Sequence, residues 1–358
     1  MPVQIAGPQA IGRVPETARR TVLLTGASGV VGRALLRRLR DVDVICLVHR
    51  APVCGQDVIT VPGDITAPLF GLAEPAYTDL ADRVDAVIHC AAVTDFHRTD
   101  GSLEATNITG TEHMAAFAAA AGAVLYHVST AFADTTADGG RGRTAIGYAT
   151  SKAAGEQVVR SSGVPHVIFR PSVIIGDSAT GEIAAFQGLH RVVAGLFAGT
   201  VPMIPFDARW PVDFIPADIV ADAIACVVEN RVGQGEFWLT AGQAALRLDE
   251  GVTVVVEAAR SLGVHVDMPR FVPPEMFDRL IGPVFLDALP GRIRRNVLRM
   301  LEFFTTYLQS GQTKPTSWDQ LATLGARPLP DQRESLRNSA LYWAAQNGYD
   351  QAQTGQAA

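Results

Sequence analysis

The chain has 358 residues, of which 48% are hydrophobic and 18% are charged, and its formal net charge is −6. This length and apolar fraction predict a globular, enzyme-sized body of one large or two fused domains. The acidic balance removes the electrostatic case for general nucleic-acid binding.

Membrane anchors and metal or disulfide frameworks are not predicted. The first nineteen residues lack a continuous apolar stretch, and no later segment holds about 18 uncharged apolar residues, so we expect a cytoplasmic protein without signal peptide or integral membrane span. Cys46, Cys54, Cys90 and Cys226 are scattered and form no CxxC motif, which argues against zinc and against disulfides. Cys46, Cys90 and Cys226 lie in apolar segments and are interpreted as small core residues.

From Thr21 onwards, short β-rich runs alternate with helical stretches. They are TVLLTG, VGRALLRRLR, DVICLVHR and DAVIHCAAV, then GTEHMAAFAAAA, AVLYHVST, SKAAGEQVVR and VPHVIFRP. This alternation predicts an α/β fold with a doubly wound, Rossmann-like parallel sheet covered by helices on both faces.

After about residue 245 the pattern changes to helical segments separated by prolines, with no clear run of strands. We predict a smaller, mainly helical C-terminal region that caps the substrate. The expected organisation is an extension over 1–19, a nucleotide-binding domain with interleaved substrate segments over 20–245, a capping region over 246–345, and a flexible tail over 346–358.

Three glycines separate the first apolar strand from the helix that follows it. In such a loop Gly26 permits a tight turn, Gly29 lets the backbone approach a pyrophosphate, and Gly32 lets helix and strand pack closely. A turn without ligand shows glycines too, but the flanking strand and helix favour a dinucleotide, and the GxxGxxG spacing points to short-chain dehydrogenases. The candidate cofactor-binding loop is Gly26, Ser28, Gly29, Val30, Val31, Gly32 and Arg33.

The second strand ends in His49 and Arg50, where an NAD enzyme usually offers a carboxylate to the ribose. An arginine favours a 2′-phosphate, and Arg33 can close the same pocket, so we predict NADP(H). The alternative is that both arginines are solvated charges. Further on, Asp64 is a candidate for the adenine amino group and Ile65 for packing on the ring.

Tyr148 and Lys152 are four residues apart in GYATSK, so on a helix they share one face. A lysine ammonium and an oxidised nicotinamide both favour a phenolate, so we expect the pKa of Tyr148 to lie below its usual value of about 10. Lys152 is also a candidate for the nicotinamide ribose. A YxxxK pair alone occurs by chance on many surface helices.

A hydroxyl pair follows the apolar strand AVLYHV. Ser129 and Thr130 would lie at the carboxyl edge of the parallel sheet, where ligands bind, and a hydroxyl there can donate to a substrate carbonyl. We assign this role first to Thr130 and second to Ser129, which can instead cap a turn. Asn107, in the preceding helix, is a candidate for setting the backbone or a proton-relay water.

Taken in order, these motifs resemble the extended short-chain dehydrogenase/reductases. GDITAPLFGL, STAF, GYxxSK and RPSVIIGDSATG are similar to the fatty acyl-CoA reductase and thioester reductase branch, and the resemblance covers about residues 20–245. Three features depart from that branch: His49 in place of a frequent arginine, Ala153 in place of a common tryptophan, and a short interval between Thr130 and Tyr148.

The resemblance implies a Rossmann-like NADP(H) domain with Thr130, Tyr148 and Lys152 as catalytic trio. It implies that the glycines hold the pyrophosphate, Arg33 and Arg50 the 2′-phosphate, and Asp64 and Ile65 the adenine. It also implies that Ala91 and Ala92 line the cofactor channel and that Pro171, Ser172 and Val173 lie against the nicotinamide. The implied reaction is reduction of an acyl thioester to an aldehyde, sometimes onward to an alcohol.

The capping region offers two features toward such a substrate. The apolar residues of 281–308 can form an acyl channel, although a helix packed on the core explains them as well. A basic cluster within it is a candidate contact for coenzyme A phosphates or an acidic carrier protein, with a solvated helix face as the alternative. Its members are Arg292, Arg294, Arg295 and Arg299.

Four functions therefore compete. The first is an NADPH-dependent reductase of an acyl thioester, CoA-bound or carrier-bound, or of the derived aldehyde. The second is a nucleotide-sugar epimerase or dehydratase, disfavoured by His49-Arg50. The third is a ketone or steroid-type alcohol oxidoreductase, and the fourth is a non-catalytic dinucleotide sensor, disfavoured by the complete trio. The prediction includes no metal and leaves room for a homodimer.

Overall fold

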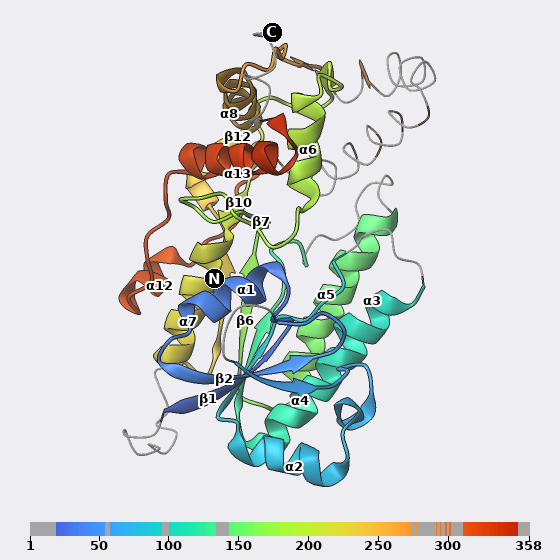
Figure 1. Cartoon of the computed structure of the whole chain (residues 1–358), viewed down its shortest axis with the longest axis vertical. Helices are drawn as coiled ribbons and strands as arrows, with labels where there is room; N and C mark the ends of the chain where they lie inside the picture. Colours follow the sequence, from blue (N-terminus) through green and yellow to red (C-terminus); the bar gives the residue numbers. More distant parts are fainter. Residues whose placement is uncertain are drawn as a thin grey trace.

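The computed structural model describes residues 19–53, 58–94, 100–133, 143–273 and 311–349, with positions 276, 277, 291, 294, 298 and 301 (Figure 1). The predicted N-terminal extension up to residue 18, Cys54, Arg292, Arg295, Arg299 and the tail from residue 350 lie outside the described residues. The 281–308 segment is described only at four positions, one of which is the exposed Arg294.

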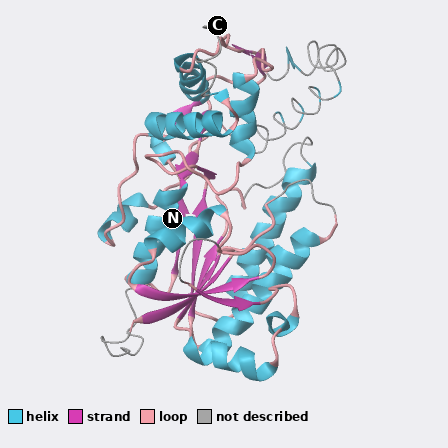
Figure 2. Ribbon diagram, in the orientation of Figure 1, coloured by secondary structure: helices cyan, strands magenta, loops and turns pink. Residues whose placement is uncertain are grey.

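A seven-stranded sheet forms the centre of the larger half of the protein (Figure 2). Its strands are β1 (Arg20–Thr25), β2 (Val42–Val48), β3 (Ile59–Pro62), β4 (Ala86–His89), β5 (Val124–Val128), β6 (His166–Pro171) and β11 (Gly235–Leu239). The order is β11-β6-β5-β4-β1-β2-β3, and every neighbouring pair is parallel. The predicted doubly wound α/β class is confirmed.

Helices cover both faces of this sheet, as its apolar strands require. The helices of one face are α1 (Val30–Arg38), α7 (Ala217–Glu229) and α12 (Trp318–Thr323). Those of the other are α2 (Glu74–Arg83), α4 (Gly110–Ala121) and α5 (Arg143–Ser161). Ahead of α4 lie the short α3 (Ser102–Glu104) and a π-helical turn over Ala105–Thr109, and a 3-10 turn over Pro68–Gly71 precedes α2.

The direction of winding reverses between β1 and β4. Chain order runs from β1 outward through β2 to β3, whereas β4, β5 and β6 extend the sheet on the other side of β1. The helices that leave these two central strands diverge to opposite faces, and in open α/β sheets ligands generally bind at such a reversal, beyond the carboxyl ends of the strands. The candidate site is expected at this point.

The smaller half packs around a separate apolar core. Its helices are α6 (Gly188–Phe197), α8 (Leu248–Ser261) and α13 (Gln332–Gln346), which lie together beyond the carboxyl edge of the sheet in Figure 1. Short strand pairs connect the halves: β7 (Val173–Ile175) with β10 (Phe214–Pro216), β9 (Pro211–Val212) with β12 (Leu246–Arg247), and β8 (Met203–Ile204) with β13 (Arg270–Phe271). A 3-10 turn over Gly242–Ala244 follows β11. The smaller half thus combines segments before and after residue 245.

The GDSATG stretch joins the two halves. Gly181 has φ +73°, and a Cβ there would stand 2.1 Å from the Asn338 carbonyl oxygen of α13. On the other side, the Ser178 amide and hydroxyl both donate to the Asp218 carboxylate at the start of α7, at 2.8 Å each. A glycine at 181 is therefore needed for α13 to pack against this turn.

Residues 318–329 return to the larger half, although the predicted capping region over 246–345 includes them. Trp318 and Leu321 of α12 pack in the core that contains α7. The Trp318 indole donates to the Thr240 carbonyl oxygen at 2.7 Å, just after β11. The short apolar sequence of α12 does not show which strand it packs against, because that strand lies some 75 residues earlier in the chain.

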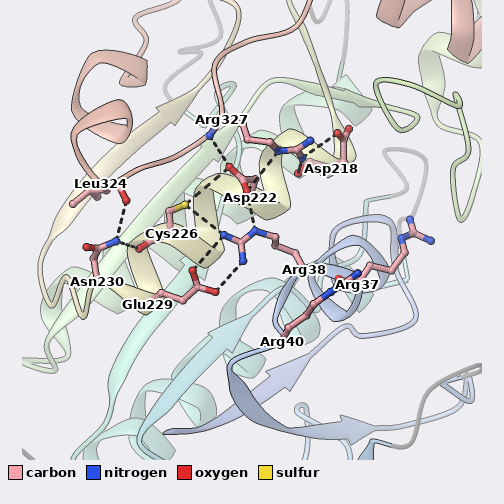
Figure 3. A network of polar contacts seen from close by, with 10 residues as sticks. All are labelled: Arg37, Arg38, Arg40, Asp218, Asp222, Cys226, Glu229, Asn230, Leu324 and Arg327. Atoms are coloured by element: carbon pink, nitrogen blue, oxygen red, sulfur yellow. Dashed lines mark hydrogen bonds and ion pairs between the residues drawn. The ribbon is translucent and has the colours of Figure 1, made fainter. Parts of the chain in front are cut away.

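Figure 3 shows the polar contacts that hold this returning segment on α7. Asp222 of α7, whose side chain is 6% exposed, accepts from Arg38 Nε of α1 at 2.8 Å and from the Arg327 amide at 2.7 Å. Arg38 also donates to Glu229 at 2.9 Å, and Asn230 donates to the Leu324 carbonyl oxygen at 3.0 Å. One carboxylate thus links three segments that are far apart in sequence.

Within the residues that the structure describes, no helix combines the length and apolar character needed to cross a membrane.

Asp222→Ala should lower the free energy of unfolding by about 2–3 kcal/mol, because it leaves the Arg38 guanidinium and the Arg327 amide without their shared acceptor. Urea denaturation of the purified protein measures this. Asp79→Ala is the matched control: its pair with Arg83 is exposed, and its loss should cost about 0.5 kcal/mol or less. Equal shifts for both variants would contradict the linking role of Asp222.

Candidate active site

The turn after β1 fits the pyrophosphate of a dinucleotide. Gly26 has φ +69°, and a Cβ there would lie 2.6 Å from the Ala91 amide nitrogen at the end of β4. A Cβ on Gly32 would lie 2.2 Å from the Gly26 carbonyl oxygen, whereas a Cβ on Gly29 would meet that oxygen at 3.2 Å. Gly26 and Gly32 are therefore required by the fold, and Gly29 leaves the N-terminus of α1 accessible to an anion.

The candidate adenosine residues surround the end of β2. Asp64 accepts from the Thr66 amide and hydroxyl at 2.9 and 2.8 Å, and its other oxygen is 3.4 Å from His49 Nε2. Burial raises the pKa of Asp64, but the Thr66 hydrogen bonds and the charges of His49 and Arg50 outweigh it and lower the pKa overall. The exposed Arg33 donates through Nε to the Ser28 carbonyl oxygen at 3.0 Å.

Ile65, unlike its neighbour Asp64, is buried in the core. Only 9% of the residue is exposed, and its side chain packs where a Cβ on Gly110 of α4 would meet it at 2.8 Å. Ile65 thus lies in the core below Asp64, and its carbonyl oxygen accepts from His113 Nδ1 at 2.7 Å.

Thr130 and Tyr148 are brought together at the carboxyl end of β5. Both are buried, with 5% and 9% of the residue exposed, and a side-chain hydrogen bond joins their hydroxyls. Burial nevertheless raises the pKa of Tyr148 to about 12, because the hydrogen bond from Thr130 offsets only part of the desolvation. The expected lowering of the Tyr148 pKa is therefore wrong for the protein without cofactor, because the phenol is buried more deeply than the YxxxK pattern indicated.

Lys152 lies one turn further along α5 and is 2% exposed. Its Nζ donates to the Val128 carbonyl oxygen, the last of β5, at 2.8 Å. Burial lowers the pKa of Lys152 to about 8, while the nearby Glu156 and Cys90 raise it. Lys152 is thus a buried cation at the ends of β4 and β5, and it lies beside Cys90, the residue that precedes Ala91.

Ser129 lies near a different group from Thr130. Its hydroxyl lies close enough to the Glu156 carboxylate to lower the pKa of Glu156. Arg170 binds that carboxylate through two hydrogen bonds of 2.9 and 2.7 Å, and Arg160 adds a third at 2.9 Å. Ser129 and Thr130 thus contact different groups, Glu156 and Tyr148 respectively.

Asn107 lies in the π-helical turn ahead of α4, and π-turns are frequent at functional sites. Its amide exchanges two hydrogen bonds with the backbone of Val93, at 2.9 and 3.1 Å, and donates to Ser151 Oγ at 2.9 Å. Ser151 in turn donates to the Tyr148 carbonyl oxygen at 2.8 Å. Asn107 therefore binds the backbone of the loop after β4 directly and reaches the backbone of α5 through Ser151.

The remaining candidates lie along the same edge. Ala91 and Ala92 are partly exposed in the loop after β4, and the Ala91 amide donates to Thr25 Oγ1 at 3.2 Å. Pro171 ends β6, Val173 begins β7, and the buried Ser172 between them donates its amide to the Leu239 carbonyl oxygen at 3.0 Å. Sequence reasoning missed Glu156 and Ser151, although both follow from the helical spacing of GYATSKAAGE.

Comparison with known proteins agrees with this geometry. A family model of NAD-binding domains, described as "Male sterility protein", matches residues 53–224. A polyketide synthase-nonribosomal peptide synthetase of Aspergillus clavatus is 31% identical over 247 residues, which are 60% of this chain and 6% of the relative. The chain therefore spans only a small fraction of the length of the curated relatives that it matches.

Two solved structures share the fold over nearly their whole length. The terminal R domain from the myxalamid PKS-NRPS biosynthetic pathway is 25% identical, with a TM-score of 0.73 over 93% of this chain and 92% of that one. These matches confirm the resemblance to the thioester reductase branch of the extended short-chain dehydrogenase/reductases. The reductase domain of a nonribosomal peptide synthetase from Mycobacterium tuberculosis has a TM-score of 0.66 over 94% of this chain and 93% of that one, at 23% identity, and adds support for the fold.

The matched model is one of NAD-binding domains. In this protein the glycine turn lies at the reversal between β1 and β4, the place where open α/β sheets generally bind their ligands.

Lys152→Met should stabilise the protein without cofactor more at pH 7 than at pH 10. The pKa of Lys152 falls from 10.5 in the unfolded chain to about 8 in the folded protein, so the unfolded chain binds more protons between these values. The buried ammonium therefore costs most below about pH 8, and this cost falls as the pH rises toward 10.5. Urea denaturation of wild type and variant at both pH values should show a stability difference that changes by about 2 kcal/mol.

A difference between the two proteins that is the same at pH 7 and pH 10 would contradict the lowered pKa of Lys152. Arg160→Met provides the matched control, because a guanidinium stays charged at both values.

Proposed function

We propose that this chain is an NADPH-dependent reductase that acts on the carbonyl carbon of an acyl thioester, bound to coenzyme A or to a carrier protein, or of the derived aldehyde. The observation that carries the proposal is the pair of joined hydroxyls, Thr130 and Tyr148, at the sheet edge beside the buried Lys152. The likeness to reductase domains of peptide and polyketide synthetases supports the thioester as substrate.

The chain's own residues perform the acid part of the reaction. NADPH, when bound, supplies a hydride. Thr130 and Tyr148 donate hydrogen bonds to the substrate carbonyl oxygen and stabilise the charge that develops there. The pKa of Tyr148, about 12, keeps the phenol protonated at neutral pH, which suits a group that must give a proton to that oxygen.

Lys152 keeps a positive charge near this oxygen. With a pKa of about 8 the ammonium is mostly protonated at pH 7, and the nearby Glu156 carboxylate favours that form. In the proposed complex Lys152 also holds the nicotinamide ribose hydroxyls. The turn over Gly26–Gly32 holds the pyrophosphate, and Ala91, Ala92, Pro171 and Val173 border the nicotinamide.

A preference for the phosphorylated cofactor follows from charge at the end of β2. Arg50 and Arg33 offer guanidinium groups to a 2′-phosphate, and no carboxylate stands at positions 49 or 50 to repel it. Asp64 is proposed to accept a hydrogen bond from the adenine amino group through the carboxylate oxygen that lies near His49 Nε2.

The direction of proton transfer at Tyr148 distinguishes this function from its competitors. An epimerase or an alcohol dehydrogenase working toward oxidation needs the phenolate as a base in its first step. Reduction begins with the phenol that the fold favours. A ketone or aldehyde reductase uses the same groups. Release of a thiol during the reaction therefore distinguishes a thioester substrate from a ketone or an aldehyde.

Tyr148→Phe should reduce thioester-dependent NADPH oxidation by at least about 100-fold, because the phenol supplies a proton and a hydrogen bond in the transition state. The assay follows NADPH absorbance with a panel of acyl-CoAs, carrier-bound acyl groups and the matching aldehydes. NADPH binding, measured by fluorescence titration, should stay within about threefold of wild type.

Tyr77→Phe is the matched control, since this partly buried tyrosine lies on α2 and packs against Phe70 and Phe117. It should keep full activity. Turnover of aldehydes or ketones without any turnover of thioesters would overturn the thioester as substrate, and full activity of Tyr148→Phe would overturn the assigned acid.

A further inference from the structure

A threonine beneath the site determines where one buried histidine carries its proton. Thr111 of α4 is fully buried, and its hydroxyl is 2.8 Å from the Asn107 carbonyl oxygen. A carbonyl can only accept, so the single hydroxyl proton of Thr111 is used there. The same hydroxyl is 3.4 Å from Nε2 of His89 and can therefore only accept from it. His89 thus carries a proton on Nε2.

The other ring nitrogen of His89 is left as an acceptor. The residue is 1% exposed, and burial together with the charge of Lys152 lowers its pKa to about 3, so the imidazole is neutral at pH 7. Its Nδ1 is 2.8 Å from Thr25 Oγ1 and accepts the proton of that hydroxyl. Thr25 Oγ1 accepts in turn from the Ala91 amide at 3.2 Å.

These contacts form one chain of hydrogen bonds with a single direction on each side of the ring. One arm runs from the Ala91 amide through Thr25 to Nδ1, and the other from Nε2 through Thr111 to the Asn107 carbonyl oxygen. Ala91 stands against Gly26 in the glycine turn. Asn107 holds Val93 and, through Ser151, the carbonyl of Tyr148.

We infer that His89 is a positioning residue: in its neutral Nε2–H form it connects the cofactor-facing loop after β4 to the π-turn that orients the helix of Tyr148. The kinetic part of this inference rests on the proposed function, whereas the hydrogen-bond chain itself does not. One arm sets where the Ala91 backbone meets the dinucleotide. The other sets the backbone that carries Tyr148.

An imidazole suits this position because it offers one acceptor and one donor on opposite edges of a rigid ring. Glutamine can place an amide donor near the position of Nε2 but leaves Thr25 without its acceptor. Asparagine can place a carbonyl acceptor near the position of Nδ1 but leaves Thr111 without its donor. The two substitutions therefore cut different arms.

The first test is a split between cofactor binding and turnover. His89→Gln should raise the NADPH Kd and KM about five- to tenfold and leave kcat within about twofold, since each lost arm removes one hydrogen bond. His89→Asn should lower kcat about five- to tenfold and leave the NADPH Kd within about twofold. Fluorescence titration with NADPH and steady-state thioester reduction provide these values.

Control variants separate this split from general loss of stability. His190 of α6 is equally buried, at 2% exposed, and binds Ser339 of α13 through Nε2 at 3.1 Å. His190→Gln and His190→Asn should lower the melting temperature without changing the NADPH Kd. In a double-mutant cycle, Thr111→Val should add little to His89→Asn, because both cut the same arm. Equal losses of binding and turnover in both His89 variants, or no loss in an active enzyme, would overturn the inference.

The second test does not require turnover. Long-range nitrogen–proton correlation spectra show which ring nitrogens of each histidine are protonated, and the His89→Asn spectrum identifies the signal that is lost. His89 should remain in the Nε2–H form from about pH 5 to pH 8, across the range in which an ordinary histidine titrates.

A proton on Nδ1, or an imidazolium at pH 7, would overturn the hydrogen-bond chain whatever the enzyme reduces. A different result is that the protein shows the Nε2–H form, with weaker NADPH binding in His89→Gln but not in His89→Asn, and yet turns over no thioester. This result would contradict the proposed function and support the role of His89.

Discussion

The close approach of Gly26 to Ala91 is the contact on which the site depends. It brings the turn after β1 within van der Waals distance of the loop after β4, at the place where the sheet reverses its winding. Any side chain at position 26 would meet the Ala91 amide, and the positive φ there already restricts the position to glycine. With this contact made, the N-terminus of α1 and the ends of β4 and β5 lie at the same edge of the sheet. Thr130, Tyr148 and Lys152 are then placed by the next two strands and by α5.

Burial decides the electrostatics of this edge of the sheet. It raises the pKa of Tyr148 and lowers that of Lys152, because removal from water favours the neutral form of each group. The Glu156 carboxylate, itself bound by Arg170, resists the loss of charge on Lys152. Keeping a charged lysine buried lowers the stability of the folded protein, and such a loss of stability is common at catalytic sites. A protonated phenol beside an ammonium is the arrangement that a reduction requires at its start.

Local pattern was enough to predict the sheet, the glycine turn and the hydroxyl of Thr130, because strand alternation and loop spacing are properties of neighbouring residues. The π-turn around Asn107, the pairing of Glu156 with Arg170 and the return of α12 to α7 depend on residues that meet only in the folded chain. The pKa of Tyr148 was predicted in the wrong direction for the same reason. A sequence shows that a lysine is near, but it does not show how much water the fold removes from the phenol. His89 and Thr111 gave no signal at all, since a histidine in an apolar strand is usually a core residue.

Transfer of deuterium from NADPH to the substrate tests the proposed reduction most directly. Purified protein is given NADPH labelled with deuterium at the transferable position and an acyl thioester, and the aldehyde or alcohol product is analysed by mass spectrometry. We predict one deuterium on the former carbonyl carbon for each two-electron step, together with release of the free thiol. Product without deuterium, or release of thiol with a carboxylic acid as the only product, would show that the site hydrolyses or rearranges its substrate and would contradict the assignment of Thr130, Tyr148 and Lys152 to reduction.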